Sequence, residues 1–132
     1  MESGTRILVV QDDPVMLGLV SGSLRPEGFI LREVGDPLEA LTIASVERDA
    51  FDLIISRVES QPITGLELAK RLAAEGINLP VLFICKSHAM AAVISGSFGP
   101  SAILLQPFSG TELRTAVKRC LNGPRRKHRR IA

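Results

Sequence analysis

Cysteine is scarce in this sequence. Cys85 and Cys120 are its only cysteines, and each lies in an apolar stretch of the chain. Residues 1–5 lead almost directly into an apolar run, so we expect no secretory signal peptide. In a chain without such a signal, two buried, reduced thiols are favoured over a disulfide or a pair of metal ligands. We therefore predict a cytoplasmic protein whose stability does not depend on disulfides.

Other absences narrow the classes of function. The sequence has no apolar run long enough to span a bilayer, so we expect no membrane partner. It also has no glycine-rich phosphate-binding loop and no cysteine or histidine spacing typical of a metal site. These absences argue against a P-loop enzyme and a zinc protein, and we predict that the chain is not an enzyme.

The charge is unevenly distributed along the chain. Although the net charge is only +2, the segment Arg125–Arg130 holds five of the 16 Lys and Arg residues and no acidic residue. The rest therefore carries 11 basic against 14 acidic residues and is mildly acidic. We predict one folded domain over residues 1–123 and a disordered basic tail over residues 124–132.

The basic tail allows two interpretations. It contains no aromatic residue on which a base could stack, and no DNA-binding helix pair precedes it. A solvated run of charge is therefore favoured over binding of nucleic acid through Arg125–Arg130. Any such binding would be driven by phosphate contacts and would depend steeply on salt.

Apolar runs and helical patterns alternate five times along the chain. The predicted strands cover residues 7–10, 29–34, 51–55, 81–85 and 102–105. Asp13-Pro14 and Asp36-Pro37 are typical helix starts, as are the spacings Thr64–Glu67 and Ser109–Glu112. The alternation predicts a parallel α/β sheet with helices on both faces and right-handed crossovers.

The third predicted strand is the most continuously apolar and is expected to be central. Its end, Ile54–Glu59, passes through Arg57 into a loop. In an open parallel sheet, ligands and chemistry lie at the carboxyl ends of the strands. The charge of Arg57 therefore bears directly on the function of the chain.

The order and spacing of five motifs make residues 5–122 resemble the receiver domains of bacterial two-component response regulators, the CheY-like family. The motifs are Ile7–Val10 followed by acidic residues and Pro14, Asp52–Ile55, Gly65–Leu68 eight residues after Arg57, Pro80–Ile84, and Gln106–Phe108. The resemblance implies a flavodoxin-like, doubly wound sheet of five parallel strands in the order 2-1-3-4-5. It also implies a signalling module of a phosphorelay.

The resemblance implies a particular chemistry. In the family, an aspartate at the end of the third strand accepts a phosphoryl group from a histidine kinase, and two acidic residues after the first strand hold Mg²⁺. A Thr or Ser after the fourth strand and a Lys after the fifth bind the phosphoryl oxygens. The Lys-Pro bond is usually cis. A divalent cation and a fixed ammonium group together stabilise the charge that develops on the phosphoryl group.

On the acidic side of the site, most matching positions of this sequence carry other side chains. The two metal-binding positions fall on Gln11 and Asp12, so that Asp12 is the only strong ligand kept, while Asp13 matches a third, often acidic position. The phosphoacceptor falls on Arg57, which is cationic at any ordinary pH and cannot accept a phosphoryl group as a carboxylate does. We therefore predict that Mg²⁺ binding and phosphorylation are lost.

The phosphoryl-binding side differs as well. The family's hydroxyl falls on Cys85, its lysine on Gln106, and its aromatic residue of the fifth strand on Ile103, while Pro107 is the candidate for the cis peptide bond. We therefore expect a degenerate receiver site that lacks the residues that usually couple the site to the surface.

Several readings of the acidic and basic residues remain open. A guanidinium beside acids at a strand edge favours an ion pair of Arg57 with Asp12, or with Asp13, over a side chain that simply points to water. Asp52 is disfavoured as an acceptor because it would stand at the wrong edge of the sheet. Glu59 could reach the site from the loop, but it lies past the acceptor position.

We predict a pseudo-receiver that regulates a signalling or transcriptional pathway through protein–protein contacts, with a protein partner or a second copy as a homodimer. The alternatives are a receiver with an unconventional phosphoacceptor and a nucleic-acid accessory protein that uses the tail. The resemblance places the partner surface on the fourth helix, fifth strand and last helix, with the candidates Met90, Val93, Ile94, Ile103, Leu113 and Val117.

Overall fold

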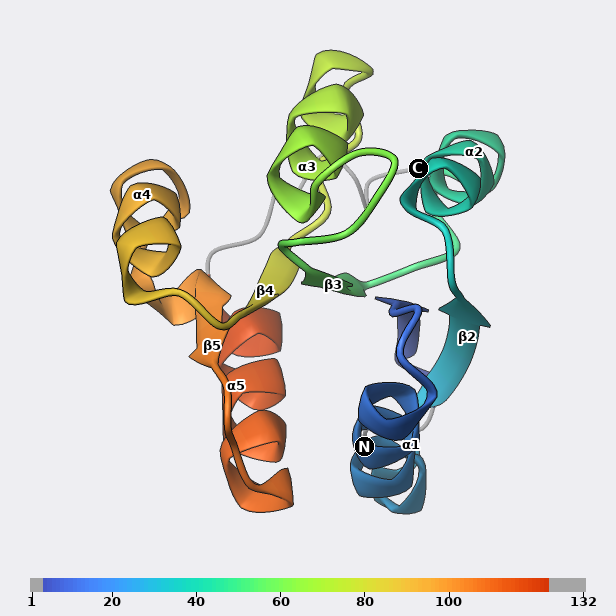
Figure 1. The fold of residues 1–132 in the computed structure, drawn as a ribbon. Coiled ribbons are helices and arrows are strands. Elements are labelled where there is room, and N and C mark those ends of the chain that lie inside the picture. The colour runs from blue at the N-terminus through green and yellow to red at the C-terminus, as the bar shows by residue number, and fades with distance from the viewer. Residues whose placement is uncertain (1–3, 124–132) are drawn as a thin grey trace.

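The computed structural model describes residues 4–123, so the predicted basic tail lies outside the described residues. Five parallel strands form one sheet in the order β2-β1-β3-β4-β5, as predicted (Figure 1). The strands are β1 (Arg6–Val10), β2 (Ile30–Val34), β3 (Leu53–Arg57), β4 (Val81–Cys85) and β5 (Ile103–Leu105). The α-helices are α1 (Pro14–Leu24), α2 (Pro37–Val46), α3 (Gly65–Ala74), α4 (His88–Phe98) and α5 (Gly110–Asn122). Short 3₁₀ turns follow α1 at Arg25–Glu27 and precede β5 at Pro100–Ala102.

The helices cover both faces of the sheet. Helices α1 and α5 lie together on one face, and α2, α3 and α4 lie on the other (Figure 1). Successive side chains of a strand point to opposite faces of the sheet. Leu53 and Ile55 of β3 therefore pack in the core beneath α1 and α5, and Ile54 packs in the core beneath α2, α3 and α4. Both faces of the central strands are therefore buried, which explains their continuous apolar runs.

Side-chain caps set the beginnings of the helices. The carboxylates of Asp13 and Asp36 accept hydrogen bonds from the backbone N–H two residues later, as their position before proline predicts. Ser109 and Glu112 form the complete reciprocal capping box of α5. At the start of α3, Thr64 accepts the cap hydrogen bond from the N–H of Glu67. The carboxylate of Glu67 accepts a hydrogen bond from Arg71 rather than from the backbone of Thr64.

The structure corrects part of the predicted partner surface. Ile94, Leu113 and Val117 are each 0% exposed and belong to the core. They lie on the faces of α4 and α5 that pack against the sheet, so they cannot contact a partner protein directly. Val93 is 56% exposed, whereas Met90 and Ile103 are partly buried against the core.

The first helix carries an unusual amount of exposed apolar surface. Val15 is 81% exposed and Leu19 is 38% exposed, although α1 contains no charged residue. Within residues 4–123, no helix combines the length and the apolar character that crossing a bilayer requires.

Candidate functional site

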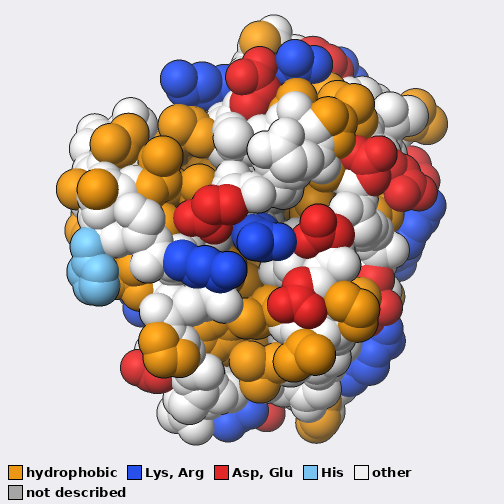
Figure 2. All heavy atoms as spheres, viewed as in Figure 1, with side chains coloured by type: hydrophobic (Ala, Val, Ile, Leu, Met, Phe, Trp, Pro, Cys, Tyr) orange, Lys and Arg blue, Asp and Glu red, His pale blue; other side chains and the backbone are white. Residues whose placement is uncertain are grey.

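The candidate site lies at the carboxyl edge of the sheet. The registers pair Val10 with Ser56, Arg57 with Ile84, and Cys85 with Leu105, so the ends of four strands meet there. Figure 2, viewed as in Figure 1, shows Lys and Arg side chains near the middle of this face, flanked by Asp and Glu side chains. The local charge is therefore mixed rather than strongly acidic.

Arg57 is the last residue of β3 and forms an ion pair with the loop after β1. Its Nη1 donates a hydrogen bond to Oδ1 of Asp12 at 2.9 Å, in agreement with the favoured sequence interpretation. The Arg57 side chain is 22% exposed and that of Asp12 is 52% exposed, so the cation is the more buried partner. The Nε of Arg57 is buried without a hydrogen-bond partner among the described residues.

Gln11 and Asp13 serve the backbone of the same loop. Gln11 is 4% exposed, its backbone N–H donates to the carbonyl of Val34, and its Oε1 accepts from the N–H of Asp13 at 3.2 Å. Oδ1 of Asp13 accepts from the N–H of Val15 at 3.0 Å as the cap of α1. Asp13 therefore caps a helix, and the Arg57 ion pair in the structure is made with Asp12.

Cys85, the last residue of β4, lies on the side of the site opposite Asp12. Its thiol is buried and lies 3.1 Å from the carbonyl oxygen of Ser87, to which it donates. Burial raises the pKa of the Cys85 thiol, and the nearby negative charge of Glu59 adds to the effect. The hydroxyl of Ser87 caps α4 by accepting from the N–H of Met90 at 3.1 Å. Cys85 thus provides a thiol that donates to the backbone, and the hydroxyl oxygen of Ser87 accepts the cap hydrogen bond of α4.

Glu59 is the site residue that the sequence interpretation set aside. Its Oε2 lies 4.0 Å from Sγ of Cys85, and its Oε1 is buried without a hydrogen-bond partner among the described residues. The sequence signal was its position two residues after Arg57, where a tight loop can turn a side chain back to the strand ends. Asp52, by contrast, precedes β3 at the opposite edge, where its Oδ2 accepts from the N–H of Arg6.

The loop after β5 completes the edge. The N–H of Gln106 donates to the carbonyl of Cys85 at 2.9 Å, and the Gln106–Pro107 peptide bond is cis. Gln106 supplies a neutral amide at this position, and the neighbouring Lys86 is exposed. The ammonium of Lys86 comes from the loop after β4 rather than from β5.

Close backbone packing holds the end of β3 in place. The N–H of Gly65 donates to the carbonyl of Val58 at 2.9 Å, where α3 returns to the strand. A Cβ atom at Gly65 would lie 2.6 Å from the carbonyl oxygen of Arg57 and 3.0 Å from Oγ of Ser56. The start of α3 can approach the strand end this closely only because residue 65 has no side chain.

The acidic groups of this edge are dispersed among other roles. Asp12 pairs with a guanidinium, Asp13 caps a helix, and Glu59 lies beside a thiol. Over the described range 4–123, no group of three or more His, Cys, Asp and Glu side chains is arranged to hold a metal ion.

Comparison with known proteins identifies the family. The family model of the response regulator receiver domain matches residues 7–118. The chain is 34% identical over 112 residues to the transcriptional regulatory protein TcrA of Mycobacterium tuberculosis, covering 84% of this chain and 44% of TcrA. It is 32% identical over 112 residues to the two-component response regulator ORR22 of Oryza sativa, covering 84% of this chain and 16% of that protein. The chain thus spans less than half the length of these two relatives.

Solved structures show the same architecture. The chemotaxis response regulator CheY4 of Vibrio cholerae superposes with a TM-score of 0.74 at 26% identity, covering 90% of this chain and all of CheY4. A response regulator receiver protein of Sinorhizobium medicae gives a TM-score of 0.76 at 26% identity over 91% of this chain and 96% of its own. Fold, family model and sequence identity agree, and the chain belongs to the response regulator receiver domain family.

Proposed function

We propose that this receiver domain works without phosphorylation, as a protein–protein interaction module in a two-component pathway. The observation that carries the proposal is the ion pair of Arg57 with Asp12 at the end of β3. The family's reaction requires a carboxylate at the position of Arg57 and a divalent cation beside it. A guanidinium there supplies the positive charge itself and takes up the one strong metal ligand that is kept.

The donor groups do not fit Mg²⁺. This cation prefers several oxygen ligands in a near-octahedral arrangement. Gln11 is occupied with the backbone of Asp13, Asp13 caps α1, and Asp12 is bound to Arg57. The cationic Arg57 would also repel a divalent ion. These contacts support a site that is held in one arrangement by internal partners.

The residues that would transmit a signal from the site are also changed. Cys85 and Gln106 stand where the family has a hydroxyl and a lysine, and Ile103 stands in place of the aromatic residue. Without a phosphoryl group to bind and without an aromatic side chain to reorient, the site and the surface lose their usual coupling. We infer that the domain presents one constant surface to its partner.

The proposed contact surface is the exposed part of α4 and β5. Val93 is its most exposed large apolar side chain, and Met90 of α4 and Ile103 of β5 are partly buried against the core. A signalling protein or a second copy of the domain is the proposed partner. The free thiols of Cys85 and Cys120 support a cytoplasmic location, because such thiols persist in a reducing compartment.

Incubation with acetyl phosphate and Mg²⁺, followed by intact mass measurement, tests the proposal. We expect no phosphoryl adduct on the native chain. The matched control carries Gln11→Asp, Arg57→Asp, Cys85→Thr and Gln106→Lys, which restores the family's residues on the same scaffold and should gain one adduct. A stoichiometric adduct on an Asp or Glu of the native chain would contradict the proposal. Peptide mapping would then identify the unconventional acceptor.

A further inference from the structure

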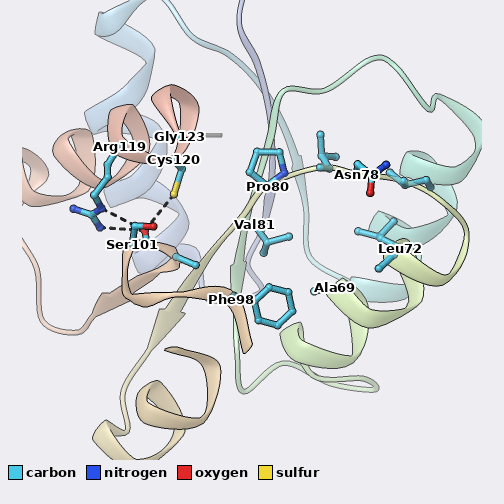
Figure 3. A pocket seen from close by; sticks show the side chains of 14 residues that line it. Ala69, Leu72, Asn78, Pro80, Val81, Phe98, Ser101, Arg119, Cys120 and Gly123 are labelled. Carbon is cyan, nitrogen blue, oxygen red and sulfur yellow. Dashed lines mark hydrogen bonds between the residues drawn. The ribbon is translucent and has the colours of Figure 1, made fainter. Parts of the chain in front are cut away.

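A second feature lies at the opposite, amino edge of the sheet. A cavity of about 300 Å³ opens where β4 begins, between the end of α3, the 3₁₀ turn before β5 and the end of α5 (Figure 3). Most of its lining is apolar, including Leu72, Ile77, Pro80, Val81, Phe98 and Ala102. This volume is at the lower end of the range of ligand pockets, roughly 300–1,000 Å³. It suits a single chain or ring rather than a nucleotide.

The floor and the rim of the cavity differ in character. Leu72, Ile77 and Val81 are nearly fully buried and belong to the core, so the floor is apolar. Phe98 is 40% exposed and stands at the rim (Figure 3). An apolar group that enters the cavity would therefore contact the buried floor and cover part of the exposed ring of Phe98.

One charge is present at the rim. Among the described residues that line the cavity, Arg119 is the only one with a charged side chain. Its Nε and Nη2 donate to the carbonyl oxygen of Ser101 at 3.4 and 3.3 Å, which ties the guanidinium to the 3₁₀ turn before β5 (Figure 3). A guanidinium has five N–H donors, so this contact leaves donors for an anion. Arg119 also offsets the partial negative charge at the carboxyl end of α5.

We propose that this cavity binds a small carboxylic acid with an apolar chain or ring. The apolar part lies on the floor formed by α3 and β4, and the carboxylate accepts hydrogen bonds from Arg119. The charge at the rim selects the anionic head, because a guanidinium and a carboxylate are geometrically complementary. The apolar lining selects the body of the ligand and excludes a simple inorganic anion.

This site is separate from the degenerate receiver site. The cavity is lined by Val81, the first residue of β4, whereas Cys85 at the other end of the same strand faces the carboxyl edge. Ligand binding at the cavity is therefore independent of whether Arg57 abolishes phosphorylation. Either proposal can fail without the other.

Titration of the ¹⁵N-labelled full chain with octanoate, below the concentration at which it forms micelles, tests the proposal. We expect saturable shifts of the amide resonances of Ala73, Val81 and Cys120. The resonances of Asp12 and Arg57 should not move. Octanol, which has the same chain length and no charge, should bind about tenfold more weakly.

Two pairs of variants separate charge from shape. Arg119→Gln should weaken octanoate binding about tenfold and leave octanol binding unchanged, whereas Lys118→Gln, one residue away and outside the cavity, should affect neither. Ala73→Leu places a larger side chain at the rim and should weaken both probes. Ala74→Leu, also exposed on α3 but outside the lining, is its control.

Several results would overturn the proposal. One is the absence of a saturable shift in the folded chain, and another is equal binding of octanoate and octanol. An unchanged octanoate affinity in Arg119→Gln, with the fold intact by its amide spectrum, would also exclude Arg119 as the group that recognises the head.

Discussion

The two edges of the same sheet differ in how they use an arginine, which is partly buried at the carboxyl edge and exposed at the amino edge. At the carboxyl edge, Arg57 turns inward and pairs with Asp12, so its charge is neutralised within the domain. At the amino edge, Arg119 holds a backbone carbonyl and lies beside an apolar cavity. The first arrangement satisfies the arginine by an internal ion pair, and the second leaves the arginine beside an open cavity. We therefore propose that the edge at which the family carries out its reaction is closed in this domain.

The two thiols give the largest expected contrast between the edges. Cys85 is 0% exposed at the carboxyl edge, whereas Cys120 is only partly buried at the cavity. A thiol reagent should modify Cys120 in the native state and reach Cys85 only when the domain opens. With the usual free energies of unfolding, the two rates should differ by roughly a thousand-fold or more. Peptide mass measurements over time provide both rates.

The pH dependence of this labelling follows from the same burial. Burial raises the pKa of the Cys120 thiol, so the reactive thiolate is a small fraction at neutral pH. The labelling rate of Cys120 should therefore rise about tenfold per pH unit and level off only above the ordinary thiol pKa. Equal labelling of both cysteines at all pH values would contradict the burial described for the carboxyl edge.

A substitution at Gly65 tests how tightly the carboxyl edge is packed. In Gly65→Ala the new Cβ would meet the carbonyl oxygen of Arg57 at 2.6 Å, so backbone must shift. We expect the free energy of unfolding to fall by about 1–3 kcal/mol, as in overpacked cores. Gly18→Ala in α1, where nothing lies within 4 Å of the new Cβ, should raise it by about 0.5–1 kcal/mol. Urea denaturation measures both, and a neutral Gly65→Ala would show a loosely packed edge.

The smallest expected effect concerns the ion pair itself. A double-mutant cycle of Arg57→Ala and Asp12→Ala should give a coupling free energy of about 0.5–1 kcal/mol, because the pair is only partly buried. The matched control is the exposed pair of Arg71 with Glu67 within α3, for which about 0.3–0.5 kcal/mol is expected. The coupling of Arg57 with Asp12 should also weaken less with added salt. A coupling free energy of zero would mean that the ion pair does not hold the loop after β1 to the end of β3.

Much of the fold could be predicted from local sequence. Strands β1, β3 and β4 are continuous apolar runs because both of their faces are covered, and Asp13 and Asp36 cap helices through contacts within two residues. The position of Arg57 at the strand end followed from the same pattern. These features depend on neighbours in the sequence, which a single sequence displays directly.

Other features depend on how distant elements meet. An apolar face can be recognised from helical spacing, but spacing alone did not separate the buried Leu113 and Val117 from the exposed Val93. Val15 continues an apolar pattern and is nevertheless 81% exposed, since no element within residues 4–123 covers it. The contact of Glu59 with Cys85 and the cavity beside Arg119 arise from tertiary packing. The position of Glu59 two residues after Arg57 is a local signal for the first, and no local pattern reveals the second.

Titration of the native chain with Mg²⁺ tests the central claim most directly. Because Asp12 is bound to Arg57 and Asp13 caps α1, the amide resonances of Asp12, Asp13 and Arg57 should show no saturable shift at millimolar Mg²⁺. The chain with Gln11→Asp, Arg57→Asp, Cys85→Thr and Gln106→Lys should shift saturably under the same conditions. A saturable response of Asp12 in the native chain would show that the ion pair opens to a metal, and it would contradict the account.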